Sequence, residues 1–236
     1  MNDATLPERL YAYLPALLSG AGYTLMVSAV AILAGFVLGA MLLGMSLAGG
    51  GRGPLPALVR LYVSFFRGTP LLVQLLMMFY LPAAAGIEPP PLVVAMAAMA
   101  LNSAAFQCEI LRAGLTAIPA GQMEAALSFG IGPRRIFRYI QLPQLARAVW
   151  PAVVSEAIDV IKNSAIVSVI AVADLARAGR QIVAANFRTL EVYLTVGLCY
   201  LLMTAAVFAL GNWMARRMRG ERSLSARVLN RRTIRT

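Results

Sequence analysis

The sequence has 236 residues, of which 60% are hydrophobic and only 13% are charged, and its mean hydropathy is +0.74. Soluble domains carry about 25% charged residues, so a chain this apolar needs lipid as its solvent. The sequence contains no histidine, which excludes histidine base catalysis and histidine metal ligands. We therefore expect a membrane protein that is not an enzyme and that has neither a metal site nor a cofactor.

Apolar segments long enough to cross a bilayer, about 20 residues each, define the predicted spans. Residues 6–18 form a shorter apolar segment, which we expect to be a separate interfacial helix. The pattern predicts an all-α polytopic membrane protein with an external or interfacial N-terminal segment (1–20), one transmembrane domain (21–217) and a basic cytoplasmic tail (218–236). The five predicted core transmembrane helices cover residues 22–47, 58–81, 92–118, 145–172 and 190–214.

Arginine positions predict the orientation, because basic residues favour the cytoplasmic side. The C-terminus is therefore expected inside, and five spans then place the N-terminus outside. The loop with Arg52 and Arg60 and the loop at 119–143 fall inside, whereas residues 173–189 fall outside although they contain three arginines. The net charge of +11 comes from arginines that lie in loops and at the C-terminus, beside apolar spans. We therefore expect this chain to contact lipid and not nucleic acid. The tail arginines are Arg216, Arg217, Arg219, Arg222, Arg227, Arg231, Arg232 and Arg235.

The loop between the third and fourth spans, residues 119–143, contains the most specific pattern. Pro119 should end the third span, Gly130 is placed to end a short helix, and Pro133 suits the first turn of the next helix. Pro143 marks the following boundary. The product is a helix–glycine–helix elbow that projects from the membrane; the alternative is a basic amphipathic loop that rests on lipid headgroups.

This loop resembles the EAA loop of permeases from binding-protein-dependent ABC importers. The resemblance implies a type I ABC importer permease fold, in which the elbow docks on a cytoplasmic ABC ATPase dimer. The chain has no P-loop, because its only lysine, Lys162, follows Ile161, so ATP hydrolysis requires a separate subunit. The matching residues are Glu124, Ala125, Ala126, Gly130, Ile140, Leu142 and Pro143, of which the first four are the expected ATPase-coupling residues.

The second span contains Phe66-Arg-Gly-Thr-Pro-Leu-Leu-Val-Gln74, where Gly68 and Pro70 should kink the helix. Either Arg67 simply snorkels to the inner interface, or the irregular turn lines the pathway with Arg67 and Gln74. The run resembles the polar amino acid branch of these permeases. That resemblance implies a subunit of a bacterial inner membrane importer, working by alternating access, with an external amino acid-binding protein and a second permease in a homo- or heterodimer.

Charged residues interrupt the fourth span, where each ion costs about 2.5–3.5 kcal/mol on insertion scales. Glu156, Asp159 and Asn163 fall on one helix face, bordered by Lys162. Asp159 and Lys162 either form a neutral pair buried at a helix contact or belong to the substrate pathway.

A zwitterionic amino acid needs an acceptor for its ammonium group and donors for its carboxylate. We expect Glu156 to be the acceptor, Asn163 and Ser164 to be donors, and Asn102 to be their neighbour on the third span. The excess of acid favours a cationic or amide side chain on the substrate. Similar permeases often have Lys-Asp-Thr-Ser where this chain has Lys162-Asn-Ser-Ala165, which leaves a cationic specificity open.

A different class of function also fits the intramembrane charges. In a stand-alone secondary transporter or channel, Glu156, Asp159 and Lys162 would form an ion relay. Secondary carriers often contain two inverted halves, and five spans do not divide in that way. A further pair, Glu109 and Arg112, is expected within the third span near its inner end.

Overall fold

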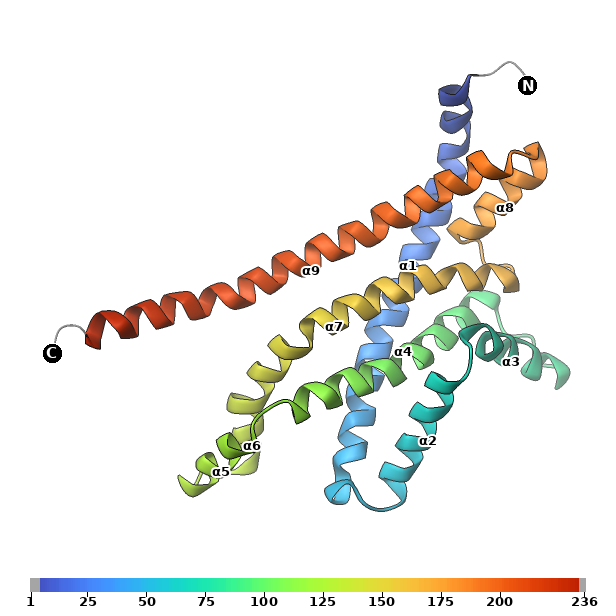
Figure 1. Ribbon diagram of the computed structural model, residues 1–236. Coiled ribbons are helices and arrows are strands. Elements are labelled where there is room, and N and C mark those ends of the chain that lie inside the picture. The colour runs from blue at the N-terminus through green and yellow to red at the C-terminus, as the bar shows by residue number, and fades with distance from the viewer. Residues whose placement is uncertain (1–4, 234–236) are drawn as a thin grey trace.

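The computed structural model describes residues 5–233, with side chains described up to Met218. All regular structure in this range is helical, as predicted (Figure 1). The α-helices are α1 (Leu6–Leu47), α2 (Pro54–Gly68), α3 (Leu71–Ala84), α4 (Pro91–Thr116), α5 (Ala120–Ser128), α6 (Pro133–Ile136), α7 (Leu142–Asn163), α8 (Leu175–Asn186) and α9 (Thr189–Thr233). Short turns of other helix types join them: η1 (Ala48–Gly51), η2 (Phe137–Gln141) and η3 (Ser164–Ile170).

Helix α1 is one continuous helix of 42 residues, so the expected separation of residues 6–18 from the first span is wrong. A capping box starts the helix, in which the backbone N–H of Thr5 donates to Glu8 Oε2 at 2.8 Å. Pro15 is accommodated inside the helix without a break. At about 1.5 Å per residue, α1 is about twice as long as the hydrocarbon core is thick, so one end extends beyond that core.

The predicted kink in the second span is confirmed and is a sharp break. Helices α2 and α3 meet at an angle of 107°. Thr69 donates its N–H to the carbonyl of Phe65 at 3.1 Å, but Pro70 has no N–H to donate to Phe66. The helix therefore ends here, and the chain changes direction before α3 begins.

The number of spans depends on how the bent pair is counted. Among the described residues, three helices are long and apolar enough to cross a membrane: α1, α4 and Thr189–Met218 of α9. If the bent pair of α2 and α3 counts as one span, the number of spans is four. Helix α7 has 22 residues but includes Arg147, Glu156, Asp159 and Lys162. A fifth span through α7 stays a prediction.

Close contacts between helices hold α4 at the centre of the bundle. A Cβ added to Gly39 of α1 would lie 2.7 Å from Cβ of Gln107 on α4. On the other side, Gly114 of α4 meets the side chains of Leu145 and Val149 of α7. Small residues thus allow α1 and α7 to approach α4 closely, as in other membrane bundles.

The fourth span was expected to continue to about residue 172, but α7 ends at Asn163 and the chain continues as the 3-10 helix η3. The small helix expected near residues 173–187 is confirmed as α8, and Asp174 caps its N-terminus by accepting from the N–H groups of Ala176 and Arg177. Arg188, one of the arginines that disagreed with the topology, lies 3.7 Å from Glu191. Helix α9 continues to Thr233, so the predicted tail begins inside it; residues 234–236 lie outside the described range.

Candidate functional site

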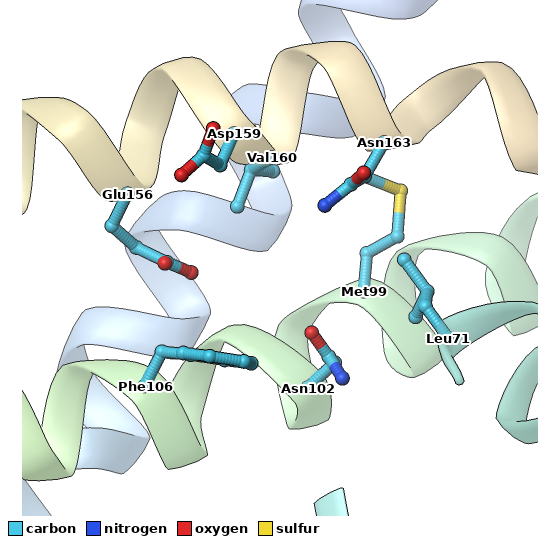
Figure 2. A pocket seen from close by; sticks show the side chains of 8 residues that line it. All are labelled: Leu71, Met99, Asn102, Phe106, Glu156, Asp159, Val160 and Asn163. Atoms are coloured by element: carbon cyan, nitrogen blue, oxygen red, sulfur yellow. The ribbon is translucent and has the colours of Figure 1, made fainter. Parts of the chain in front are cut away.

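A cavity of about 160 Å³ lies between α4 and α7, with one residue from the start of α3. This volume is well above the roughly 10–15 Å³ that one water molecule needs, so the cavity has room for part of a small solute. Figure 2 shows polar side chains of α7 facing α4 across it. The lining residues are Leu71, Met99, Asn102, Phe106, Glu156, Asp159, Val160 and Asn163.

The polar half of the lining is the stripe predicted from helical spacing. Glu156, Asp159 and Asn163 are three and four residues apart on α7, so an α-helix places them on one face. Asn102 projects from α4 on the opposite wall. The structure therefore brings together four of the residues that the sequence suggested for a substrate pathway.

Glu156 is anchored by a partner that the sequence analysis did not single out. The hydroxyl of Ser103 donates to Glu156 Oε1 at 2.8 Å. Ser103 follows Asn102 directly, so one turn of α4 contributes both a lining residue and the support for the opposite carboxylate. Phe106, which completes the apolar part of the wall, was also missed, because one phenylalanine in an apolar span gives no distinguishing signal.

Asp159 and Lys162 form the predicted pair, with Nζ 2.7 Å from Oδ1. Each side chain is 56% exposed, so within this chain the pair is not buried at a helix contact, contrary to one of the two interpretations of the sequence. Ionised groups at membrane depth require water or a protein partner. The exposed face of α7 around this pair is therefore suited to a water-filled pathway or to a second subunit, and not to lipid.

The remaining predicted pathway residues do not line the cavity. Ser164 is buried, and its hydroxyl donates to the carbonyl of Ile161 at 2.7 Å. Arg67 lies 3.9 Å from Glu109 and sits over the Phe106 ring, 5.4 Å from its centroid. Gln74 is buried at the break between α2 and α3.

The pair of Glu109 and Arg112 is confirmed, with Oε1 and Nε 3.1 Å apart, although this N–H is not aligned for a hydrogen bond. Arg67 approaches the same carboxylate from the end of α2. Two arginines thus share one glutamate, and one of them, Arg67, also contacts the ring of the lining residue Phe106.

The predicted elbow is present at the end of the molecule opposite α8 (Figure 1). Helix α5 ends before Gly130, whose φ is +72° and whose N–H donates to the carbonyl of Leu127 at 2.9 Å. Pro133 opens α6 as predicted. At Pro143 the chain does not break: the π-helical turn η2 leads directly into α7, so Pro143 lies within a continuous helical stretch.

The elbow exposes apolar side chains at its tip next to charged ones. Glu124 and Ala125 are exposed, whereas Ala126 is buried within the chain and is not available to another surface. Phe129 is 85% exposed at the tip, next to the exposed side chain of Leu127. Exposed aromatic residues on a projecting loop are typical of a surface that binds another protein.

A helical membrane chain with a polar cavity between its spans and a projecting elbow has the features of a transport permease. Comparison with known proteins agrees: residues 40–220 match the family described as binding-protein-dependent transport system inner membrane component. The chain belongs to this family and is a multi-pass protein of the inner membrane.

Characterised relatives are similar over most of their length. The arginine transport system permease protein ArtQ of Bacillus subtilis is 35% identical over 92% of this chain and 96% of the relative. The octopine permease OccM of Rhizobium radiobacter is 34% identical over 88% of this chain and 89% of its own. The glutamine permease GlnP of Escherichia coli K12 is 32% identical over 89% of this chain and 96% of its own.

Solved structures have the same fold. A crystal structure of an amino acid ABC transporter with histidines matches with a TM-score of 0.83 and 34% identity, covering 89% of this chain and 97% of that one. An inward-facing methionine ABC transporter matches with a TM-score of 0.73 at 23% identity, covering 86% of this chain and 96% of its own, which shows the shared fold alone.

Proposed function

We propose that this chain is the permease subunit of an ATP-driven importer for polar amino acids with cationic or amide side chains. The observation that carries the proposal is the cavity between α4 and α7, where Glu156, Asp159, Asn163 and Asn102 face one another inside an apolar membrane domain. Intramembrane polar groups in such a cavity mark a solute path. The named relatives transport arginine, octopine and glutamine, which are polar amino acids or their derivatives.

Charge complementarity supports the substrate class. The lining contains two carboxylates, Glu156 and Asp159, and among its described residues no cationic side chain. The carboxylate of Glu156 can accept from the ammonium group of an amino acid, and the amide of Asn163 can donate to its carboxylate. A cationic or amide side chain can then bind the second oxygen of Asp159, whose Oδ1 lies 2.7 Å from Lys162 Nζ.

Energy coupling is proposed to occur at the elbow. Glu124, Ala125, Ala126 and Gly130 form or end α5, and the exposed Phe129 projects beyond it. In this proposal the elbow docks on a cytoplasmic ABC ATPase dimer, and closure of that dimer drives alternating access of the cavity. The C-terminus and elbow then lie in the cytoplasm, and the N-terminus and α8 face the external binding protein.

A second permease subunit, identical or related, completes the pathway in this proposal. The half-exposed pair of Asp159 and Lys162 supports a second subunit. A helix face with ionised groups at membrane depth needs contact with protein or water and not with lipid. This face of α7 then lies toward the partner or the shared aqueous path.

The function is tested with the intact complex, purified from its native membrane and reconstituted in proteoliposomes with ATP inside or outside. We expect uptake of radiolabelled arginine or glutamine that requires ATP and the binding protein. Glu156→Gln should lower uptake at low substrate concentration about tenfold or more, since a hydrogen bond to a charged group contributes about 1.5–3 kcal/mol. The matched control is Glu8→Gln, which makes the same change at an exposed carboxylate and retains the capping box; its uptake should stay within about twofold of wild type.

The same assay separates the proposal from a stand-alone carrier. Proteoliposomes that contain this chain alone should take up no amino acid under a proton or sodium gradient. Gradient-driven uptake without an ATPase would overturn the importer and favour an ion relay through Glu156, Asp159 and Lys162.

A further inference from the structure

The break between α2 and α3 leaves a backbone carbonyl without its usual partner. In a continuous helix the carbonyl of Phe66 accepts from the N–H of the residue four positions later, which here is Pro70. Two side-chain amides fill this role: Gln74 Nε2 donates to the Phe66 oxygen at 2.9 Å, and Asn102 Nδ2 donates to it at 3.1 Å. The break thus gathers amides from α3 and α4 around one oxygen.

Gln74 is only 2% exposed, and its amide is fixed in one orientation. The two hydrogens of its nitrogen are shared among three acceptors: the carbonyl of Phe66, the carbonyl of Thr69 at 3.0 Å and the Thr69 hydroxyl oxygen at 2.8 Å. The Thr69 hydroxyl donates its own hydrogen to the carbonyl of Phe65 at 2.8 Å, so all three atoms act as acceptors toward this nitrogen and the Gln74 oxygen must point the other way. That oxygen accepts from Asn102 Nδ2 at 2.9 Å.

Asn102 is fixed in turn. Its nitrogen has two hydrogens, and both are used, one by Phe66 and one by Gln74. Its oxygen is therefore the polar atom left for the cavity. Figure 2 shows this oxygen on the side that faces α7 and the nitrogen turned away. In the reverse orientation the Asn102 oxygen would face two other acceptors, the oxygens of Phe66 and Gln74.

We propose that Gln74 is a positioning residue that sets the substrate specificity of the cavity by holding the Asn102 oxygen toward it. Glu156 and Asp159 each have one carboxylate oxygen engaged, by Ser103 and by Lys162, and contribute the other. With these oxygens and that of Asn102, acceptors dominate the lining, and Asn163 is the lining residue whose amide N–H groups are left to donate. An acceptor-rich cavity prefers a guanidinium or ammonium side chain, which offers only donors, over a carboxamide, which also presents an oxygen. This inference rests on the proposed function and narrows it to cationic amino acids.

The test measures equilibrium binding of radiolabelled arginine, with glutamine as competitor, to the permease–ATPase complex purified without binding protein. Selectivity then reports the cavity and not the external protein. We expect wild type to prefer arginine. Gln74→Met removes the acceptor that holds Asn102 and should lower this preference about tenfold, the fold-change for one hydrogen bond to a charged group.

A double-mutant cycle shows whether Gln74 acts through Asn102. Asn102→Ala should lower the preference by a similar factor, and adding Gln74→Met to it should cause no further loss. Gln181→Met, the same change at an exposed glutamine of α8, is the control and should keep the wild-type ratio. A purely structural role would weaken arginine and glutamine equally and leave the ratio unchanged, which would overturn the inference.

Gln74→Glu tests whether Gln74 positions Asn102 even if the Gln74→Met complex fails to assemble. It keeps an oxygen that accepts from Asn102, so the preference for arginine should not fall below that of wild type, although the complex should be less stable. A tenfold fall in this variant would refute the positioning role. Equal binding of both amino acids by wild type would also refute it while leaving an amino acid importer in place, whereas a wild-type complex that transports no amino acid refutes the proposed function itself.

Discussion

The packing of α1 on α4 can be tested at Gly39. A methyl group at this position would lie 2.7 Å from Cβ of Gln107, 2.9 Å from the carbonyl oxygen of Ala104 and 3.0 Å from the backbone nitrogen of Cys108. Two of these atoms belong to the backbone of α4, so the helices must separate to admit the methyl group. Overpacking of this kind costs about 1–3 kcal/mol, which exceeds the gain of up to about 1 kcal/mol from replacing glycine by alanine in a helix.

We therefore expect Gly39→Ala to lower the free energy of unfolding by about 1–2 kcal/mol. For a chain of this size, thermal unfolding of the purified protein in detergent should show a Tm lower by about 2–8 °C. Gly44→Ala is the matched control on the same helix, because Gly44 is exposed and an added Cβ meets nothing within 4 Å. Its Tm should be unchanged or slightly higher. Equal Tm values for the two variants would refute the close contact between α1 and α4.

Two further substitutions test the elbow and the cap of α8. Gly130 has a φ of +72°, so Gly130→Ala should strain the elbow by about 1–2 kcal/mol and lower substrate-stimulated ATP hydrolysis by the complex, whereas Gly132→Ala, in an ordinary extended conformation, should not. Equal hydrolysis rates would contradict a coupling role for this turn. Asp174→Ala removes an acceptor for two N–H groups of α8 and should lower the free energy of unfolding by about 1 kcal/mol or more; an unchanged Tm would show that the cap contributes nothing.

Features confined to one helix or one turn could be predicted from the sequence. The positions of Glu156, Asp159 and Asn163 on one face follow from the period of the α-helix, which tertiary packing does not change. The end of α5 at Gly130 and the break at Pro70 follow from local backbone chemistry. Composition alone required a membrane environment for the chain.

Features that depend on two helices meeting were decided by the tertiary structure. No pattern in the sequence indicated that Ser103 would support Glu156, since these residues lie on different spans. Ser164 was expected to face the substrate, but its hydroxyl is bonded to Ile161 where α7 changes to a 3-10 helix. Local periodicity cannot predict where one helix type replaces another.

The cavity shows both contributions. Sequence by itself determined that acids would line one face of α7, because every residue involved belongs to the same helix. Only the tertiary structure decided that Gln74 and Asn102 meet at the carbonyl of Phe66, because that contact joins α2, α3 and α4 across a break of 107°. Proline chemistry left the carbonyl without a helical partner, and the packing of three helices selected which side chains replaced it.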